Sequence, residues 1–83
     1  MCYYVYLIIT KYKHNFISYV GFTNNLNKRL AQHNSSKGAK FTRGRKWKLI
    51  YKEKHRTKSK AISREYYIKN NRTLRNIIKN INK

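Results

Sequence analysis

The chain has 83 residues, enough for one small domain with a modest core and too few for a second domain. It has 21 lysines and arginines and two acidic residues, which gives a formal charge of +19. Two acidic residues are too few for sites built from several carboxylates, as in two-metal nucleases and glycosidases. This positive charge is interleaved with aromatic residues, which favours a phosphate-rich polymer as partner; a proteome biased toward lysine and asparagine is the simpler alternative.

The N-terminal part of the chain is expected to form a β-hairpin. Residues 3–10 are apolar on both alternating faces, which is typical of a central strand covered on both sides. A polar turn separates them from a second strand at residues 16–20. A four-residue loop would set an antiparallel register with Tyr6 directly opposite Tyr19, so that the two tyrosines share one face.

A helix is expected directly after this hairpin. Gly21 ends the second strand, and either Thr23 or Asn24 can cap the helix by accepting from its free N–H groups. Leu26 and Leu30 stand one turn apart and mark the side that faces the core. The end of the strand therefore places Tyr19 close to the start of the helix.

The second half of the chain is expected to add one strand and two helices. Residues 34–46 form a loop with two glycines and five basic residues, and residues 47–53 alternate apolar residues with lysine, as in a peripheral, half-exposed strand. Thr57 or Ser59 can cap the next helix, and Thr73 the last one. The predicted fold is α+β: a three-stranded antiparallel sheet flanked by helices in the order ββαβαα.

Glu65 is the most informative acidic residue. Glu53 ends the exposed third strand, where a solvated carboxylate needs no explanation, whereas Glu65 lies on a helix face that should pack against the sheet. Its two interpretations are an ion pair with a nearby cation and a ligand for Mg²⁺ or Mn²⁺. The predicted buried stripe comprises Ala61, Ile62, Glu65, Tyr66 and Ile68.

Four other residues could carry chemistry. Tyr6 and Tyr19 are either core tyrosines or hydroxyls that orient or deprotonate water, with pKa values lowered by surrounding cations and a metal ion. Arg29 could clamp a phosphate, and His33 could move a proton or hold a phosphate oxygen; each could also be an ordinary surface residue. As an i,i+4 pair, Arg29 and His33 are expected to line the rim of one groove.

The remaining basic residues near this helix and loop suit the nucleic-acid backbone, which positions a protein without reading sequence. Trp47 is expected in the core rather than stacked on a base. The predicted nucleic-acid-binding residues are Lys28, Lys37, Lys40, Arg43, Arg45 and Lys46.

The motifs and their spacing resemble the GIY-YIG nuclease domain, and most closely its short stand-alone members, over residues 3 to 80. The residues that carry the resemblance are Tyr4-Val5-Tyr6, Tyr19-Val20-Gly21, Leu26, Arg29, Leu30, His33 and Glu65, with Gly38 to Gly44 following the helix. Two departures are Tyr4, which stands where the first motif has its glycine, and Phe22, which stands where some relatives carry lysine.

The resemblance implies one nuclease domain over residues 1–83 and a one-step hydrolysis with a single divalent metal, Mg²⁺ or Mn²⁺. It implies that Glu65 binds the metal and that Arg29 binds the phosphate. Tyr6 or Tyr19, with a slight preference for Tyr19, would help to deprotonate the attacking water. His33 matches a histidine found in several branches. No small-molecule cofactor is expected.

The main hypothesis is a DNA endonuclease with little sequence preference of its own, because no recognition domain is present in the chain. Selectivity would come from branched or flapped DNA, a partner protein or self-association. The alternative is a nucleic-acid-binding module with weak or absent catalysis, acting on DNA or RNA.

Location follows from what the sequence lacks. With the single cysteine Cys2, no disulfide can form within the chain, and no run approaches the length of a membrane span. We expect an intracellular protein without a membrane partner, in the cytoplasm or nucleoid. If the chain comes from a virus of eukaryotes, we expect it in the nucleus or the viral factory.

Overall fold

A computed structural model of the chain describes residues 2–35, 42 and 44–81. The elements are β1 (Tyr3–Tyr12), β2 (Asn15–Thr23), α1 (Leu26–Asn34), β3 (Lys48–His55), α2 (Lys58–Lys69) and α3 (Arg72–Ile81). The predicted order ββαβαα is confirmed, with each strand longer than its apolar run. Among the described residues, no helix combines the length and hydrophobicity that crossing a bilayer requires.

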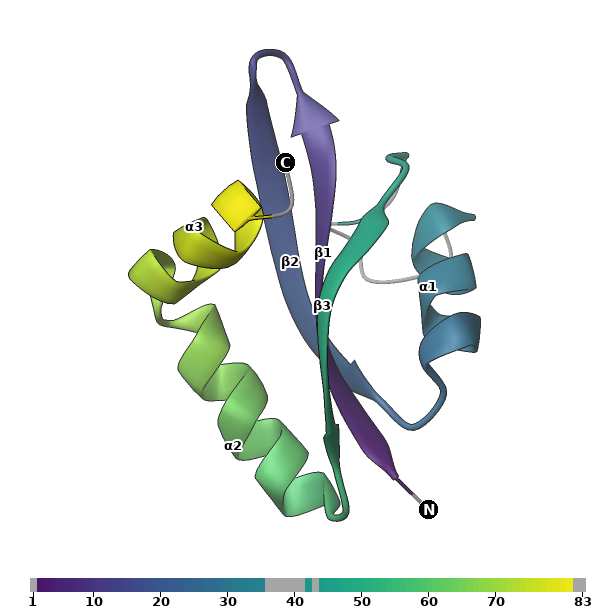
Figure 1. The fold of residues 1–83 in the computed structure, drawn as a ribbon. Helices are drawn as coiled ribbons and strands as arrows, with labels where there is room; N and C mark the ends of the chain where they lie inside the picture. Colours follow the sequence, from purple (N-terminus) through teal and green to yellow (C-terminus); the bar gives the residue numbers. More distant parts are fainter. Residues whose placement is uncertain (1, 36–41, 43, 82–83) are drawn as a thin grey trace.

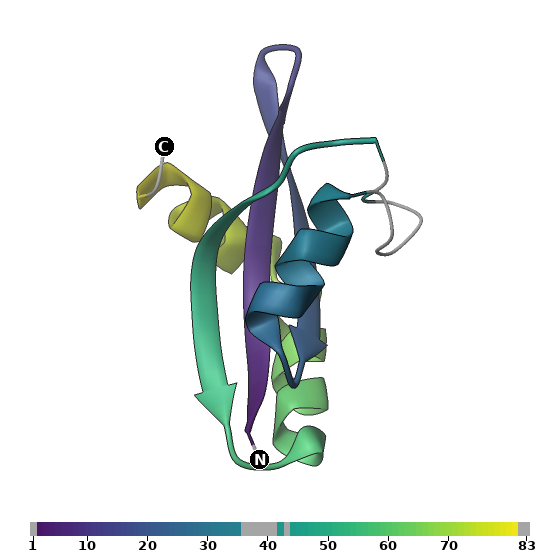
Figure 2. The same ribbon diagram turned by 90° about the vertical axis from the view of Figure 1, so that its right-hand side faces the viewer.

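The three strands form an antiparallel sheet in the order β2-β1-β3. α1 covers one face of this sheet, and α2 and α3 cover the other (Figures 1 and 2). The central position of β1 and the peripheral position of β3 are as predicted, because a strand covered on both faces must be apolar at every position.

Each face of the sheet has its own core. Toward α2 and α3, strand residues Val5, Leu7 and Val20 pack with helix residues Ala61, Ile68 and Ile78. Toward α1, the buried residues Tyr6, Ile8 and Trp47 pack with Tyr19, Leu26 and Leu30. The core position predicted for Trp47 is confirmed. Each large side chain buried in this way contributes roughly 1.5–3 kcal/mol to folding.

The predicted register of the hairpin is wrong by two residues. The turn has two residues, Lys13 and His14, instead of four, so Tyr6 lies opposite Gly21 and Tyr19 opposite Ile8. Because side chains alternate with a period of two, a shift of two leaves every residue on its predicted face. The two tyrosines therefore share a face but are diagonal neighbours instead of a direct pair.

Two of the three predicted helix caps are wrong by one or two residues. Asn25, rather than Thr23 or Asn24, caps α1, and its side chain accepts from the backbone N–H of Lys28. Thr57 caps α2, which confirms one of the two candidates there. The side chain of Asn71, rather than that of Thr73, accepts from the first turn of α3. Asparagine is as good a cap as threonine, so composition could not separate neighbouring candidates.

The predicted apolar stripe of α2 is too wide. Ala61 and Ile68 are buried and Glu65 is half-buried, but Ile62 and Tyr66 are exposed. The helix contacts the sheet along a narrow line, so residues on the flanks of its apolar stripe remain in solvent.

Glu53 is not a solvated carboxylate as predicted. Its side chain is 13% exposed and pairs with Arg64 of α2, whose Nε lies 2.8 Å from Oε1 and 2.9 Å from Oε2. The hydroxyl of Tyr51 donates to Glu53, and His55 Nε2 lies 3.0 Å from Oε1. Burial alone would raise the pKa of Glu53, but the hydrogen bonds from Arg64, Tyr51 and His55 together lower that pKa to about 2.

This cluster predicts a specific pH dependence of stability. The carboxyl of Glu53 has a lower pKa in the folded chain than in the unfolded chain, so its stabilisation is complete above the unfolded pKa. It is lost as the pH falls from about 5 toward 2, at a cost of about 2 kcal/mol after allowance for solvent screening at Arg64. Chemical denaturation at several pH values measures this slope, which Glu53→Gln should flatten while destabilising the protein at pH 7.

Candidate active site

His33 of α1 is buried and bridges two hydroxyl groups. Its exposed fraction is 0%, so the predicted place on the rim of a groove is wrong. Nε2 lies 2.8 Å from the hydroxyl of Tyr6, and Nδ1 lies 2.8 Å from the hydroxyl of Thr42. A buried imidazole is tolerated because both ring nitrogens have partners. In the sequence, His33 continues the i, i+4, i+7 stripe of Leu26 and Leu30, a signal for burial.

The protonation states of His33 and Tyr6 follow from their burial. Desolvation lowers the pKa of His33, and the nearby charge of Arg29 lowers it further, so the ring is neutral at pH 7. Burial raises the pKa of Tyr6 to about 12, although Arg29 acts against that rise. The cation Arg29 by itself therefore does not bring the pKa of Tyr6 below its usual value, and the effect predicted for a bound metal stays a prediction. A protonated phenol can donate to Nε2 while Nδ1–H donates to Thr42.

Gly21 provides the space for the phenol of Tyr6. A Cβ atom at this position would lie 2.7 Å from Cζ of Tyr6, closer still to its hydroxyl, and 3.2 Å from Cε2 of Tyr19. Any larger residue would push Tyr6 away from His33. The prediction that Gly21 ends the second strand is wrong, because β2 continues to Thr23; the glycine is instead required for close approach of a neighbouring side chain.

Tyr19 lies on the same face and is half-buried, whereas only 2% of Tyr6 is exposed. Its ring meets that of His33 edge-on, with centroids 5.2 Å apart, and that of Trp47 at 6.5 Å. Trp47 in turn donates from Nε1 to the carbonyl of Thr42, which fixes the residue that binds His33. Tyr19, which is partly accessible to solvent, thus packs against the buried hydrogen-bonded residues Tyr6, His33 and Thr42.

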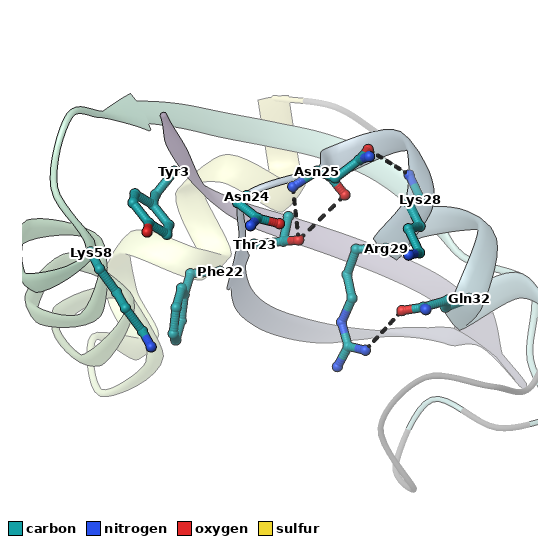
Figure 3. A pocket seen from close by; sticks show the side chains of 9 residues that line it. All are labelled: Tyr3, Phe22, Thr23, Asn24, Asn25, Lys28, Arg29, Gln32 and Lys58. Carbon is teal, nitrogen blue, oxygen red and sulfur yellow. Dashed lines mark hydrogen bonds between the residues drawn. The ribbon is translucent and has the colours of Figure 1, made fainter. Parts of the chain in front are cut away.

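Arg29 lines an open pocket of about 460 Å³ at the start of α1 (Figure 3). Its Nη1 donates to Oε1 of Gln32, 3.1 Å away, so a residue of the same helix fixes the position of the guanidinium. Gln32 was not predicted, although its i,i+3 spacing could have suggested it. The lining residues are Tyr3, Phe22, Thr23, Asn24, Asn25, Lys28, Arg29, Gln32 and Lys58. Arg29 is the one predicted catalytic residue among them.

Glu65 lies on α2, across the sheet from α1 (Figure 1). Its side chain is 19% exposed, and Oε1 lies 3.4 Å from Nζ of Lys69, so the predicted ion-pair alternative is present. The charges of both Arg29 and Glu65 act on Tyr6. Because α1 and α2 cover opposite faces, a ligand that touches both residues must pass around the sheet, and Lys58 at the start of α2 already lines the pocket of Arg29.

The residues present suit a weak site for a hard cation. Within the described part of the chain, no group of three or more His, Cys, Asp or Glu residues could hold a metal. Glu65 is a partly exposed carboxylate whose partner Lys69 is half exposed and can move aside. A divalent ion can be held by one carboxylate when waters and phosphate oxygens complete its shell. The donor set therefore fits a metal that binds together with a phosphate substrate.

The predicted nucleic-acid-binding residues fall into two groups. Lys28 lines the pocket of Arg29, Lys46 is exposed, and the guanidinium of Arg45 stacks on the ring of Tyr12 with 5.3 Å between Cζ and the centroid. The other three, Lys37, Lys40 and Arg43, lie outside the described residues.

Fold and site together define a small domain of the nuclease type, in which an arginine lines an open pocket beside the hydrogen-bonded pair of Tyr6 and His33. The chain belongs to the GIY-YIG family: the GIY-YIG catalytic domain matches residues 2–78. This match confirms the resemblance drawn from the motifs. Nucleases of this family act on DNA and are generally metal-dependent.

Relatives of similar size support the assignment. The chain is 52% identical to a UPF0213 protein of Clostridium perfringens over 65 residues, which cover 77% of this chain and 69% of the relative. It is 46% identical to a UPF0213 protein of Staphylococcus haemolyticus over 65 residues, covering 77% and 78%. The solution NMR structure of a UPF0213 protein from Bacillus halodurans matches with a TM-score of 0.52 and 31% identity over 98% of this chain and 85% of that one.

Proposed function

We propose that this protein is an endonuclease that hydrolyses DNA phosphodiester bonds with a single Mg²⁺ or Mn²⁺ ion. The observation that carries the proposal is the position of Arg29. Its guanidinium lines an open pocket and lies close enough to Tyr6 to act on the pKa of that phenol. A fork-shaped cation beside buried phenol and imidazole groups suits a scissile phosphate whose charge grows in the transition state.

The residues that touch the substrate would be Arg29, Glu65 and Tyr19. Arg29 would bind the scissile phosphate through its two terminal nitrogens, with Gln32 fixing their direction. Glu65 would hold the metal, which when bound lowers the pKa of a water molecule and offsets phosphate charge. Tyr19 would orient the attacking water, because it is the more exposed of the two phenols.

Tyr6 and His33 would be positioning residues. With exposed fractions of 2% and 0%, neither can touch DNA without a change in packing. Of the two roles considered for His33, holding a phosphate oxygen therefore loses support. The hydrogen bonds that link Tyr6, His33 and Thr42 would fix the position of the Tyr19 ring, which contacts His33. They would also hold a proton next to the cleavage site.

Contacts to the backbone would position the DNA without reading its sequence, since the basic side chains around the pocket suit phosphate oxygens. Selectivity would then come from a branched or flapped substrate, a partner protein or self-association.

Nicking of supercoiled plasmid DNA tests the proposed activity. We expect conversion to the open-circular form with Mg²⁺ or Mn²⁺ and none with excess EDTA, because a lone carboxylate and cations cannot generate the nucleophile at neutral pH. Gel mobility of a radiolabelled duplex at matched salt should show that EDTA leaves DNA binding in place. Cleavage at the same rate in EDTA would contradict the metal-dependent mechanism.

A binding module without catalysis is the second candidate. The ion pair between Glu65 and Lys69 favours it, because an acid already neutralised by a lysine needs no metal. DNA binding with no cleavage across both metals and across linear, branched and flapped DNA would establish this alternative. Stronger binding of RNA than of DNA at matched salt would extend it to an RNA-binding role.

A further inference from the structure

The tip of the β1–β2 hairpin extends beyond the rest of the described molecule. In two views at right angles, the tip lies past the ends of α1, α3 and β3 (Figures 1 and 2). All of its residues, Lys11, Tyr12, Lys13, His14 and Asn15, are exposed. Neither the core nor the pocket of Arg29 uses them. A two-stranded ribbon of this kind is free to enter a groove in a partner.

The chemistry of the tip is that of a surface for phosphate and bases. Around the ring of Tyr12, Nζ of Lys13 lies 5.5 Å from the centroid and Cζ of Arg45 lies 5.3 Å from it. The side of the hairpin forms a groove of about 640 Å³ with residues 44–46, which precede β3; the lining residues are Thr10, Lys11, Tyr12, Gly44, Arg45 and Lys46. Cations alternating with an aromatic ring are suited to nucleic acid.

Among the described residues, no acidic side chain pairs with Lys11 or Lys13. The chain has two carboxylic side chains, and these pair with Arg64 and Lys69 on α2. The cations of the tip therefore repel one another until an external anion is bound. This repulsion disfavours the folded chain alone and favours a complex with a polyanion.

Lys13 is also held in an unfavourable backbone conformation. Its φ of 56° lies in the left-handed region, where turns normally place glycine or asparagine. A lysine at such a position costs stability, and its exposed side chain lies over the ring of Tyr12 without entering the core. The two-residue turn requires this φ but not a lysine, since glycine or asparagine would adopt it at lower cost, so the charge is what distinguishes Lys13 from the usual turn residues.

We propose that the hairpin tip enters the major groove of duplex DNA and binds phosphates on both sides of it, at a distance from the cleavage site. The major groove of B-form DNA is about 12 Å wide and admits a two-stranded ribbon, whereas the major groove of A-form RNA is too narrow. From Tyr6 to Tyr12 the strand spans roughly 20 Å, or about six base pairs. The surface extends the proposed nuclease function, and its placement relative to the cut rests on that function.

Binding to DNA stem-loops with Ca²⁺ in place of Mg²⁺ tests this surface. A stem of 18 base pairs would reach both the pocket and the tip, and one of six would not. We expect Lys11→Ala/Lys13→Ala to weaken binding to the long stem on the order of tenfold and to reduce the slope of log K against log salt by about 2. On the short stem, the double variant and the wild type should bind equally.

The matched control is Lys60→Ala/Arg72→Ala, which removes the same charge from exposed positions at the starts of α2 and α3. This pair should leave the difference between long and short stems unchanged. An equal loss in both double variants would overturn the proposal, because the effect would then come from net charge alone. An equal loss on an RNA stem of 18 base pairs would overturn entry into the major groove.

Lys13→Gly separates strain from charge. We expect its melting temperature to rise by a few degrees while its affinity for the long stem falls, because glycine accepts the positive φ but carries no charge. A rise in melting temperature with unchanged affinity would overturn the role of Lys13. Failure of the nuclease proposal would look different: the tip variants would still lose binding, and the wild type would not cut DNA.

Discussion

Glu65→Gln should reduce metal-dependent DNA cleavage on the order of 10³-fold, or about 4 kcal/mol of lost transition-state stabilisation. Glutamine keeps the shape of the side chain but removes the charge that holds a divalent ion. The other acidic side chain, Glu53, is bound to Arg64 and is therefore not available to replace it. Single-turnover cleavage over a series of Mg²⁺ concentrations measures the effect, and high Mg²⁺ should restore part of the activity.

Lys69→Gln is the control that separates the two interpretations of Glu65. It breaks the same 3.4 Å ion pair but leaves the carboxylate in place. If Glu65 is a metal ligand, this variant should cut DNA at least as well as the wild type, at lower metal concentration. If the two variants lose activity equally, the ion pair itself is what matters and the metal role is wrong. Their melting temperatures should agree closely with the wild type, because an i,i+4 pair whose lysine is half exposed is worth about 0.3–0.5 kcal/mol.

Arg29→Ala should lower the rate of cleavage by about 10³-fold while DNA binding weakens only slightly. The guanidinium lines the open pocket and would bind the phosphate more tightly as charge develops on it. In single-turnover measurements, the loss should therefore fall on the rate constant at saturating enzyme instead of on the half-saturating enzyme concentration. Arg29→Lys should recover a minor part of the rate, since it keeps the charge without the planar fork.

Two neighbouring substitutions make this test specific. Lys28→Ala removes a cation from the same pocket and should mainly reduce binding and its salt slope. Gln32→Ala removes the acceptor that holds Arg29 and should give a loss between those of the other two variants. A cleavage defect in Lys28→Ala as large as that in Arg29→Ala would show that the pocket supplies only general positive charge.

The sequence was sufficient for the arrangement of the sheet. The run of apolar residues in β1 identified a strand covered on both faces, and the alternation in β3 identified an edge. Tyr6 and Tyr19 were placed on the correct face despite a wrong register, because a shift of two residues preserves the alternation. The turn itself could not be predicted, since its length depends on Lys13 adopting a positive φ that lysine rarely adopts.

The two acidic residues show where reasoning from the sequence fails. Glu53 and Glu65 were assigned opposite environments from their local elements, yet the more strongly bound of the two is Glu53. Its partner Arg64 is eleven residues away on another element, and nothing in either segment encodes that contact. With 21 candidate cations in the chain, the sequence could not choose the partner.

By itself, the sequence determined the order of the elements, the two faces of the sheet and the set of residue types from which a site could be built. These follow from hydrophobic periodicity and motif spacing, which are local along the chain. Tertiary structure alone decided that His33 is buried between Tyr6 and Thr42, that Gly21 makes room for Tyr6, and that Arg29 faces an open pocket. Those outcomes depend on contacts between distant residues, because burial and pKa are set by whatever packs against a group in space.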